Sequence, residues 1–258
     1  MNSMRKGSGP PLLLVHGLGG NRHSFDTIID ALAAQREVIA IDLPGFGETP
    51  PLAGEVSIRT LADAVGAFLA ENGLTGVDAV GSSMGARLVL ELARRGDVGA
   101  TVALDPGGFW TDRERRIFGA SVALSVRLLR VLEPVLPAIT ASRVARTLLL
   151  AQFSSRPWRL SPEVTLRELR SFVASASFDE ALESLVHGPL QDGAAAGSTR
   201  GPITIGWGRR DYVTLPRQAK RALARFPGAR LEWFDGSGHF PHWDAPEDAT
   251  RVILAATG

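Results

Sequence analysis

The 258-residue sequence contains no cysteine, and this absence excludes disulfide bonds, thiolate nucleophiles and cysteine-based metal sites. An excess of charge of either sign is also missing, because 28 Lys and Arg residues nearly cancel 27 Asp and Glu residues. The overall charge therefore predicts neither the basic surface of a nucleic-acid-binding protein nor an acidic tail. We expect a small-molecule partner and no nucleic acid.

Long apolar runs are lacking as well. Residues 1–10 hold too few apolar residues for a signal peptide, so we expect no secretion signal. The most apolar later stretch, Ile117–Leu132, is interrupted by Arg127 and Arg130 and therefore falls short of the roughly 20 apolar residues of a membrane span. We expect no membrane span and, in keeping with the lack of cysteine, a cytoplasmic location. The sequence does not define the oligomeric state.

What the sequence does contain is a series of short, apolar, β-branched runs, each followed by Gly, Pro or Asp. Six such runs are present: Pro11–Val15, Glu37–Ile41, Val77–Gly81, Ala100–Leu104, Pro202–Trp207 and Arg230–Phe234. Helical spacing is found between them at Ser24–Ala34, Ser57–Asn72, Met84–Arg95 and Pro216–Phe226. This alternation is typical of a parallel sheet covered on both faces, and we predict a doubly wound, mostly parallel α/β fold.

No apolar strand-like run is found from Thr111 to about Leu190. This stretch contains four helix-like segments, separated by Pro134, Pro137, Pro157 and Gly188. Helix starts are marked by Thr111 with Glu114 and Ser177 with Glu180, which fit capping boxes, and by Ser161 before Pro162. We predict that residues 111–190 form a helical lid inserted into a core made of residues 1–110 and 191–258.

The strongest local motif is Gly81-Ser82-Ser83-Met84-Gly85, a G-x-S-x-G between a predicted strand and a predicted helix. A serine on such a sharp turn is held in a strained conformation, and the flanking glycines let neighbouring backbone approach. We therefore predict Ser83 as a nucleophile. The alternative is a turn of small residues without chemistry.

Two backbone N–H groups are predicted to stabilise negative charge on the substrate oxygen. The Met84 N–H lies at a helix start, and the Gly-rich loop after the first strand, His16–Gly20, can direct the Leu18 N–H at the same oxygen. We interpret His16 itself as a turn-stabilising residue. A dinucleotide-binding loop is excluded because Arg22 occupies the position of the third glycine, and no Walker motif is present, so we expect no cofactor and no metal.

A serine hydroxyl needs an imidazole to accept its proton and a carboxylate to orient that imidazole. Of the five histidines, His239 follows the last predicted strand in a Gly-rich loop and is the predicted base. His242 is the nearest competitor, but we interpret it as packing against or capping the following helix. His23 and His187 lie in helix or lid contexts.

Two aspartates at strand ends are candidates for the carboxylate. Asp211 follows the strand Pro202–Trp207 and completes the chain order Ser83, Asp211, His239, which is the order of one class of serine hydrolases. Asp105 is the rival, and we interpret it as a structural turn residue before Pro106. Asp211 is therefore the predicted orienting acid.

These motifs together resemble the α/β-hydrolase family. The resemblance includes Asp42-Leu43-Pro44-Gly45-Phe46-Gly47 after the second strand and extends over nearly the whole chain. It implies the α/β-hydrolase fold, a Ser–His–Asp triad and a helical lid, and it implies that Asp42 is a structural turn carboxylate. One departure is that only about ten residues precede the first predicted strand, so the two leading antiparallel strands of the family are expected to be shortened or absent.

The predicted lid is rich in apolar residues, which favours a largely apolar substrate. Its aromatic residues are Phe118, Phe153, Trp158, Phe172 and Phe178, although any one of them more often belongs to the packing of the lid itself. The arginines Arg113, Arg115, Arg116, Arg127 and Arg130 could meet an acidic substrate, but a solvated helix face is the preferred interpretation.

We predict a serine hydrolase that cleaves a carboxylic ester or a related acyl bond through an acyl-enzyme. Lactone cleavage and hydrolysis of a C–C bond beside a carbonyl are narrower versions of the same chemistry. One alternative keeps the fold but performs cofactor-free oxidation, perhydrolysis or rearrangement, with His239 chiefly as a base. Another is a ligand receptor without turnover, which the intact set of Ser83, Asp211 and His239 argues against.

Overall fold

The computed structural model describes residues 1–258 and contains one seven-stranded sheet. Its strands are β1 (Ser3–Lys6), β2 (Pro11–Val15), β3 (Glu37–Ile41), β4 (Asp78–Ser82), β5 (Thr101–Leu104), β6 (Ile203–Gly208) and β7 (Arg230–Phe234). The order across the sheet is β1-β3-β2-β4-β5-β6-β7, with β1 antiparallel to β3 and every other pair parallel. The predicted doubly wound, mostly parallel sheet is therefore confirmed.

Strand β1 agrees with the expectation that the leading antiparallel strands are shortened, although the sequence does not predict its position. Ser3 pairs with Ile41 and Lys6 with Val38, so one short antiparallel strand does precede the first apolar run. Its sequence, Ser-Met-Arg-Lys, lacks an apolar run because this edge strand is mostly exposed. Hydrophobic patterning cannot mark a strand of this kind.

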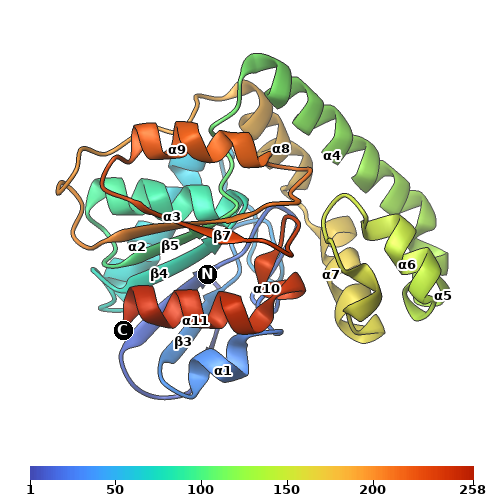
Figure 1. Cartoon of the computed structure of the whole chain (residues 1–258), viewed down its shortest axis with the longest axis horizontal. Helices are drawn as coiled ribbons and strands as arrows, with labels where there is room; N and C mark the ends of the chain where they lie inside the picture. The colour runs from blue at the N-terminus through green and yellow to red at the C-terminus, as the bar shows by residue number, and fades with distance from the viewer.

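The sheet is covered by helices on both faces because successive residues of each strand point to opposite sides. Leu12 and Leu14 face one core, which includes α1 (Ile29–Ala33) and α11 (Pro246–Thr257). Leu13 and Val15 face the other core. That second layer is formed by α2 (Ile58–Glu71), α3 (Met84–Arg95) and α9 (Ala219–Arg225), on the opposite side of the sheet from α11 (Figure 1).

A helical insertion lies between β5 and β6, beside one end of the sheet (Figure 1). It contains α4 (Asp112–Leu132), η1 (Glu133–Val135), α5 (Leu136–Ala141), α6 (Arg143–Leu150), η2 (Pro157–Arg159), α7 (Pro162–Ala174) and α8 (Phe178–His187). The sequence predicts four helical segments, whereas five α-helices form, because the chain turns at Ser142 without a proline. No helix of the chain combines the length and the apolar character that crossing a bilayer requires.

The predicted helix caps of the insertion are mostly present. Thr111 and Glu114 form a reciprocal capping box, and the Ser161 hydroxyl accepts from the Val164 N–H. The predicted box at Ser177 is wrong, since the Ser177 side chain makes no cap hydrogen bond; its backbone N–H instead donates to the Gly45 carbonyl. A contact with the core thus replaces the local cap.

The helix predicted over Ser24–Ala34 is shorter than expected, since only α1 forms there. Asn21 Oδ1 accepts from the His23 N–H at 2.7 Å, and the Asn21 N–H donates to Ser24 Oγ at 3.1 Å. Side chains that bond to nearby backbone in this way stabilise turns at the expense of helix. The short helices η3 (Pro216–Gln218) and α10 (Pro241–Asp244) complete the fold.

The strand order fixes where a ligand site can form. After β2 the chain moves outward to β3, and after β3 it crosses back to β4 on the other side of β2. The loops that follow β2 and β4 therefore diverge and leave a crevice at the carboxyl edge of the sheet. The first loop begins at His16 and the second carries Ser83.

Candidate active site

Ser83 occupies the turn between β4 and α3. Its backbone has φ 55° and ψ −113°, a left-handed conformation that a residue with a Cβ adopts only at an energetic cost. The turn therefore stores strain and directs the Ser83 side chain away from the sheet edge. Because Met84 is the first residue of α3, its N–H has no acceptor within the helix.

The two glycines of the G-x-S-x-G motif allow the backbone to pack at this turn. A Cβ on Gly81 would overlap the carbonyl group of Gly85, and a Cβ on Gly85 would overlap the carbonyl oxygens of Val15 and His16. Both glycines are thus required by close backbone approach, and the same approach brings the loop after β2 against the turn.

Ser83, His239 and Asp211 form one hydrogen-bonded chain. His239 Nε2 lies 2.9 Å from Ser83 Oγ, and His239 Nδ1 lies 2.9 Å from Asp211 Oδ2. When Nδ1–H donates to the carboxylate, Nε2 is left as the acceptor for the serine hydroxyl. His239 and Asp211 are 2% and 1% exposed, so little water competes for either bond.

Asp211 is held in place by further donors. Its Oδ1 accepts from the N–H groups of Val213 and Thr214, and its Oδ2 accepts from Thr214 Oγ1 at 2.6 Å as well as from His239. The strand end alone would leave this side chain free to rotate. The turn at 211–214 therefore fixes the carboxylate in the direction of the imidazole.

The predicted oxyanion donors lie close to Ser83. A Cβ on Gly17 would sit 3.2 Å from Ser83 Cβ, so the loop after β2 is in contact with the serine. The Leu18 N–H next to Gly17 donates no hydrogen bond within the chain, and the Met84 N–H starts α3. The loop that contains Leu18 and the first turn of α3 thus both lie next to Ser83.

The buried carboxylate of Asp244, which the sequence analysis did not single out, holds the loop that carries His239, called the histidine loop below. Asp244 accepts from the Gly238 N–H at 2.7 Å and from the Ser155 N–H at 2.8 Å, and the Phe153 carbonyl accepts from the His239 N–H at 2.8 Å. The loop that carries His239 is therefore attached to residues of the helical insertion. Nothing in the local sequence marks this long-range contact.

Asp105 is more than the turn residue that the sequence predicts. It is fully buried, has φ 48°, and accepts from the Gly208 N–H at 2.8 Å, while its second carboxylate oxygen has no partner. Burial raises the pKa of Asp105 well above its usual range, and the neighbouring Asp211 carboxylate adds to the rise. Asp105 therefore keeps its proton to a higher pH than an exposed aspartic acid does.

Asp105, Asp211 and His239 each place a possible ligand atom within 4.8 Å of the others. This set has the composition of a small cation site. However, the Asp211 and His239 atoms that face each other already share a hydrogen bond, and the remaining Asp211 oxygen accepts from two backbone N–H groups. These donors match a carboxylate acting as a hydrogen-bond acceptor better than one acting as a metal ligand.

The other buried histidines are structural. His16 Nε2 accepts from the Leu43 N–H at 3.0 Å, and burial lowers the pKa of His16 to about 4, so the predicted turn-stabilising role is confirmed. The His242 ring packs 4.9 Å from the Phe25 ring, and burial lowers the pKa of His242 to about 3. Neither imidazole is hydrogen-bonded to Ser83.

Asp42 likewise stabilises the turn predicted around it. Its carboxylate accepts from the Arg22 N–H at 2.7 Å and from the Glu48 N–H at 3.0 Å, and it pairs with the Arg22 guanidinium. The side chain is completely buried. Both carboxylate oxygens therefore accept hydrogen bonds that hold neighbouring loops.

An apolar cavity lies inside the helical insertion next to the histidine loop. Its space for water-sized molecules is only about 20 Å³, and nine of its ten lining residues are hydrophobic. Val122, Val126 and Leu129 of α4 line one side, and Phe172 and Phe240 line another. The Phe240 ring lies 4.8 Å from the His239 ring, so the cavity ends close to the proposed reacting atoms.

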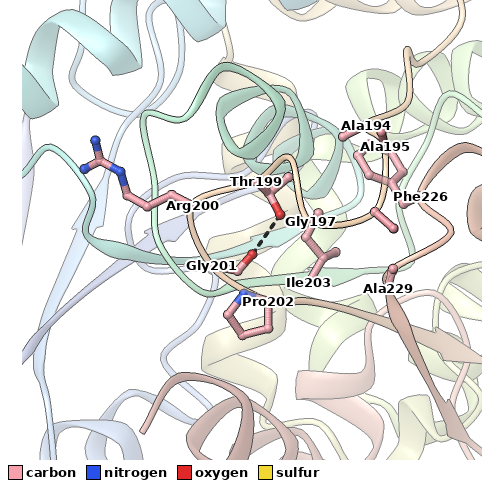
Figure 2. Close-up of a pocket in the computed structure, with 12 residues that line it drawn as sticks. Ala194, Ala195, Gly197, Thr199, Arg200, Gly201, Pro202, Ile203, Phe226 and Ala229 are labelled. Atoms are coloured by element: carbon pink, nitrogen blue, oxygen red, sulfur yellow. Dashed lines mark hydrogen bonds between the residues drawn. The ribbon is translucent and has the colours of Figure 1, made fainter.

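A different pocket lies at the opposite edge of the sheet. Figure 2 shows it beside the start of β6, between the loop that contains Thr199 and Arg200 and the residues Phe226 and Ala229. Its space for water-sized molecules is about 270 Å³. Asp211 follows the other end of β6, so this pocket is separated from Ser83 by the length of a strand.

Comparison with known proteins gives concordant results. Residues 12–251 match the sequence model described as the Alpha/beta hydrolase family. An uncharacterised protein of Mycobacterium tuberculosis is 31% identical over 96% of this chain and 75% of its own length. A pimeloyl-[acyl-carrier protein] methyl ester esterase of Aeromonas hydrophila is 27% identical over 96% of both chains. A thermophilic esterase from Thermogutta terrifontis superposes with a TM-score of 0.74 at 20% identity, over 98% of this chain and 91% of that one.

Proposed function

The chain belongs to the alpha/beta hydrolase family, and from this we propose that it is a serine hydrolase that cleaves a carboxylic ester or a related acyl bond. The observation that carries the proposal is the hydrogen-bonded chain from Ser83 through His239 to Asp211, with the serine on a strained turn. An esterase among the relatives is consistent with this chemistry.

In the proposed reaction, Ser83 Oγ attacks the acyl carbon while His239 Nε2 accepts the serine proton. The Asp211 carboxylate keeps His239 Nδ1 protonated and stabilises the imidazolium that forms. The Leu18 and Met84 N–H groups donate to the developing oxyanion. His239 then protonates the leaving group, and an activated water releases the acyl group from Ser83.

We further propose that the helical insertion, residues 111–190, acts as a lid and that the substrate is a largely apolar small molecule. The apolar side chains that line the small cavity between α4 and Phe240 favour an apolar acyl or alkyl group close to Ser83. The contacts of Asp244 with Ser154 and Ser155 support a lid that is attached to the catalytic loop. Lactones and substrates with a C–C bond beside a carbonyl fit the same machinery.

The test is labelling with a fluorophosphonate probe, which reacts with activated serines, followed by peptide mapping and a panel of short to long acyl esters. The native chain should be labelled at Ser83 and hydrolyse esters, and Ser83→Ala and His239→Ala should lose both properties. Full hydrolysis by Ser83→Ala would refute the nucleophile. No labelling with product formation would instead indicate base chemistry by His239, and ligand binding without turnover would indicate a receptor.

A further inference from the structure

The outward face of α4 is unusually apolar for a surface helix. Ile117, Leu124, Leu128 and Val131 are between 48% and 77% exposed, and their spacing of seven, four and three residues places them on one face. The inward face is apolar too, since Val122 and other residues line the cavity described above. A helix that is apolar on two faces is normally covered on both.

The apolar surface continues onto the neighbouring helices. Val135 in η1 and Val144 and Leu148 in α6 are half or more exposed, and Trp158 in η2 is 47% exposed. These elements lie together at one end of the molecule (Figure 1). We call the exposed residues between 117 and 159 the insertion surface.

The charge of the insertion surface is mainly positive. Its exposed basic residues are Arg127, Arg130, Arg143 and Arg159, of which Arg130 pairs with Asp179 of α8 at 3.0 Å. Glu133 is the one acid in this stretch; its side chain is 43% exposed and lies 3.8 Å from Arg170. The acids Asp179, Glu180 and Glu183 of α8 border the surface and are exposed outside it.

We propose that the insertion surface binds peripherally to an anionic lipid bilayer. Exposed aliphatic side chains and a tryptophan enter the headgroup region, while arginines interspersed among them meet lipid phosphates. This goes beyond the proposed hydrolase activity and does not require it. If that activity is present, a substrate dissolved in lipid would reach the apolar cavity by passing α4, whose opposite faces touch the bilayer and the cavity.

A second copy of the chain is a poorer occupant of this surface. A two-fold symmetric contact places a patch against itself, which would bring arginines of the insertion surface against the same arginines of the partner. Glu133, the one acid of the surface, would offset only part of this repulsion. An anionic bilayer satisfies the apolar and the basic residues together.

The test is flotation of the full chain with vesicles of phosphatidylcholine alone and of phosphatidylcholine mixed with phosphatidylglycerol. The native chain and Ser83→Ala should both bind the mixed vesicles, and binding should weaken at high salt. The double variants Leu124→Gln/Leu128→Gln and Arg127→Gln/Arg143→Gln should each bind roughly tenfold or more weakly. All four positions are exposed, so thermal unfolding should be unchanged.

A matched control is Arg59→Gln/Arg251→Gln, which removes the same charge from α2 and α11 on other parts of the surface. It should bind like the native chain. Absence of binding to mixed vesicles, or equal binding by control and surface variants, would overturn the proposal. So would a concentration-dependent dimer in sedimentation that Leu124→Gln/Leu128→Gln abolishes, because it would identify a second copy as the occupant.

Discussion

At the residue scale, the turn at Ser83 requires glycine at positions 81 and 85, because a Cβ at either position would overlap backbone atoms. Gly85 lies against the carbonyl groups of Val15 and His16, so a single methyl group there would displace either α3 or the loop after β2. Both movements separate Ser83 from the Leu18 N–H. Stability and oxyanion geometry are therefore coupled at this one position.

We predict that Gly85→Ala destabilises the protein by roughly 2–4 kcal/mol and lowers ester hydrolysis at least tenfold, because a buried overlap must be relieved by backbone movement. Urea unfolding and ester kinetics measure the two effects. Gly54→Ala is the control, since a Cβ there meets no atom within 4 Å. Equal free energies of unfolding for Gly85→Ala and Gly54→Ala would contradict the predicted overlap at Gly85.

A second prediction at this scale concerns Asp105. Because burial raises its pKa, the folded state keeps the proton while the unfolded chain releases it above its ordinary pKa of about 3.8. Stability is therefore lost as pH rises from that value toward the folded-state pKa. Asp105→Asn removes this loss, and its amide oxygen can still accept from the Gly208 N–H.

The free energy of unfolding of Asp105→Asn and of the native chain should be measured in urea at pH 5 and pH 8. The value for the variant minus the value for the native chain should be larger at pH 8 than at pH 5. Asp248→Asn, an exposed change in α11, should show no such trend. A pH-independent difference for Asp105→Asn would mean that Asp105 is ionised in the fold.

At the element scale, the histidine loop is positioned by the insertion as much as by β7. Asp244 connects Gly238 to Ser154 and Ser155, and the Phe153 carbonyl binds the His239 N–H. Removal of the carboxylate leaves these donors without an acceptor and frees the loop. The imidazole would then lose its fixed distance from Ser83 Oγ.

We predict that Asp244→Ala lowers kcat for ester hydrolysis roughly 10- to 100-fold with a smaller change in KM, since misplacing a general base affects the chemical step. Asp244→Asn keeps an acceptor oxygen and should recover part of the loss. The exposed change Asp248→Ala should have no effect. A rise in KM alone would assign Asp244 to substrate binding instead.

Elements that repeat a simple physical pattern could be predicted from the sequence, and the rest depended on contacts between distant residues. All six apolar runs became strands within one residue of their predicted ends, and helices α2 and α3 lie where helical spacing placed them. Strand β1 was missed because its Ser-Met-Arg-Lys sequence carries no apolar run. Its pairing depends on the exposed edge of β3.

In the candidate active site too, features set by local sequence could be predicted, and features set by contacts between distant residues could not. Ser83, Asp211 and His239 each follow a strand, so sequence order and strand ends were enough to predict that they meet. The proximity of Asp105 to Asp211 could not be predicted, because it depends on β5 and β6 being adjacent across an insertion of about 80 residues. Asp244 was missed for a similar reason, since its partners lie about 90 residues away.

At the scale of the whole molecule, three buried titratable groups make the free energy of unfolding depend on pH, because burial disfavours their charged forms. Burial lowers the pKa of His16 to about 4 and of His242 to about 3, and it raises the pKa of Glu168 to about 7. As pH falls below about 6.5, the unfolded chain takes up protons at both histidines while the folded chain does not, so the histidines lower stability in acid. Glu168 has the opposite effect, because the folded chain takes up a proton there at a higher pH than the unfolded chain and so gains stability as pH falls.

We predict that His242→Leu is less sensitive to acid than the native chain. The difference in free energy of unfolding between the two should shift in favour of the variant as pH falls from 7 to 4.5, because one of the two histidine contributions is removed. Urea unfolding over this range measures it. His187→Leu is the control, since His187 is exposed, and an equal shift for both would contradict the prediction.

The bond from the His239 N–H to the Phe153 carbonyl has a further consequence for protein engineering. A chimaera cut at the two ends of the insertion would exchange residues 111–190 as a unit. Such a cut would replace the partners of Asp244 and of the histidine loop with a foreign sequence. A graft that retains native residues 153–156, and exchanges only the helices before or after them, should therefore preserve the reacting geometry while altering the cavity.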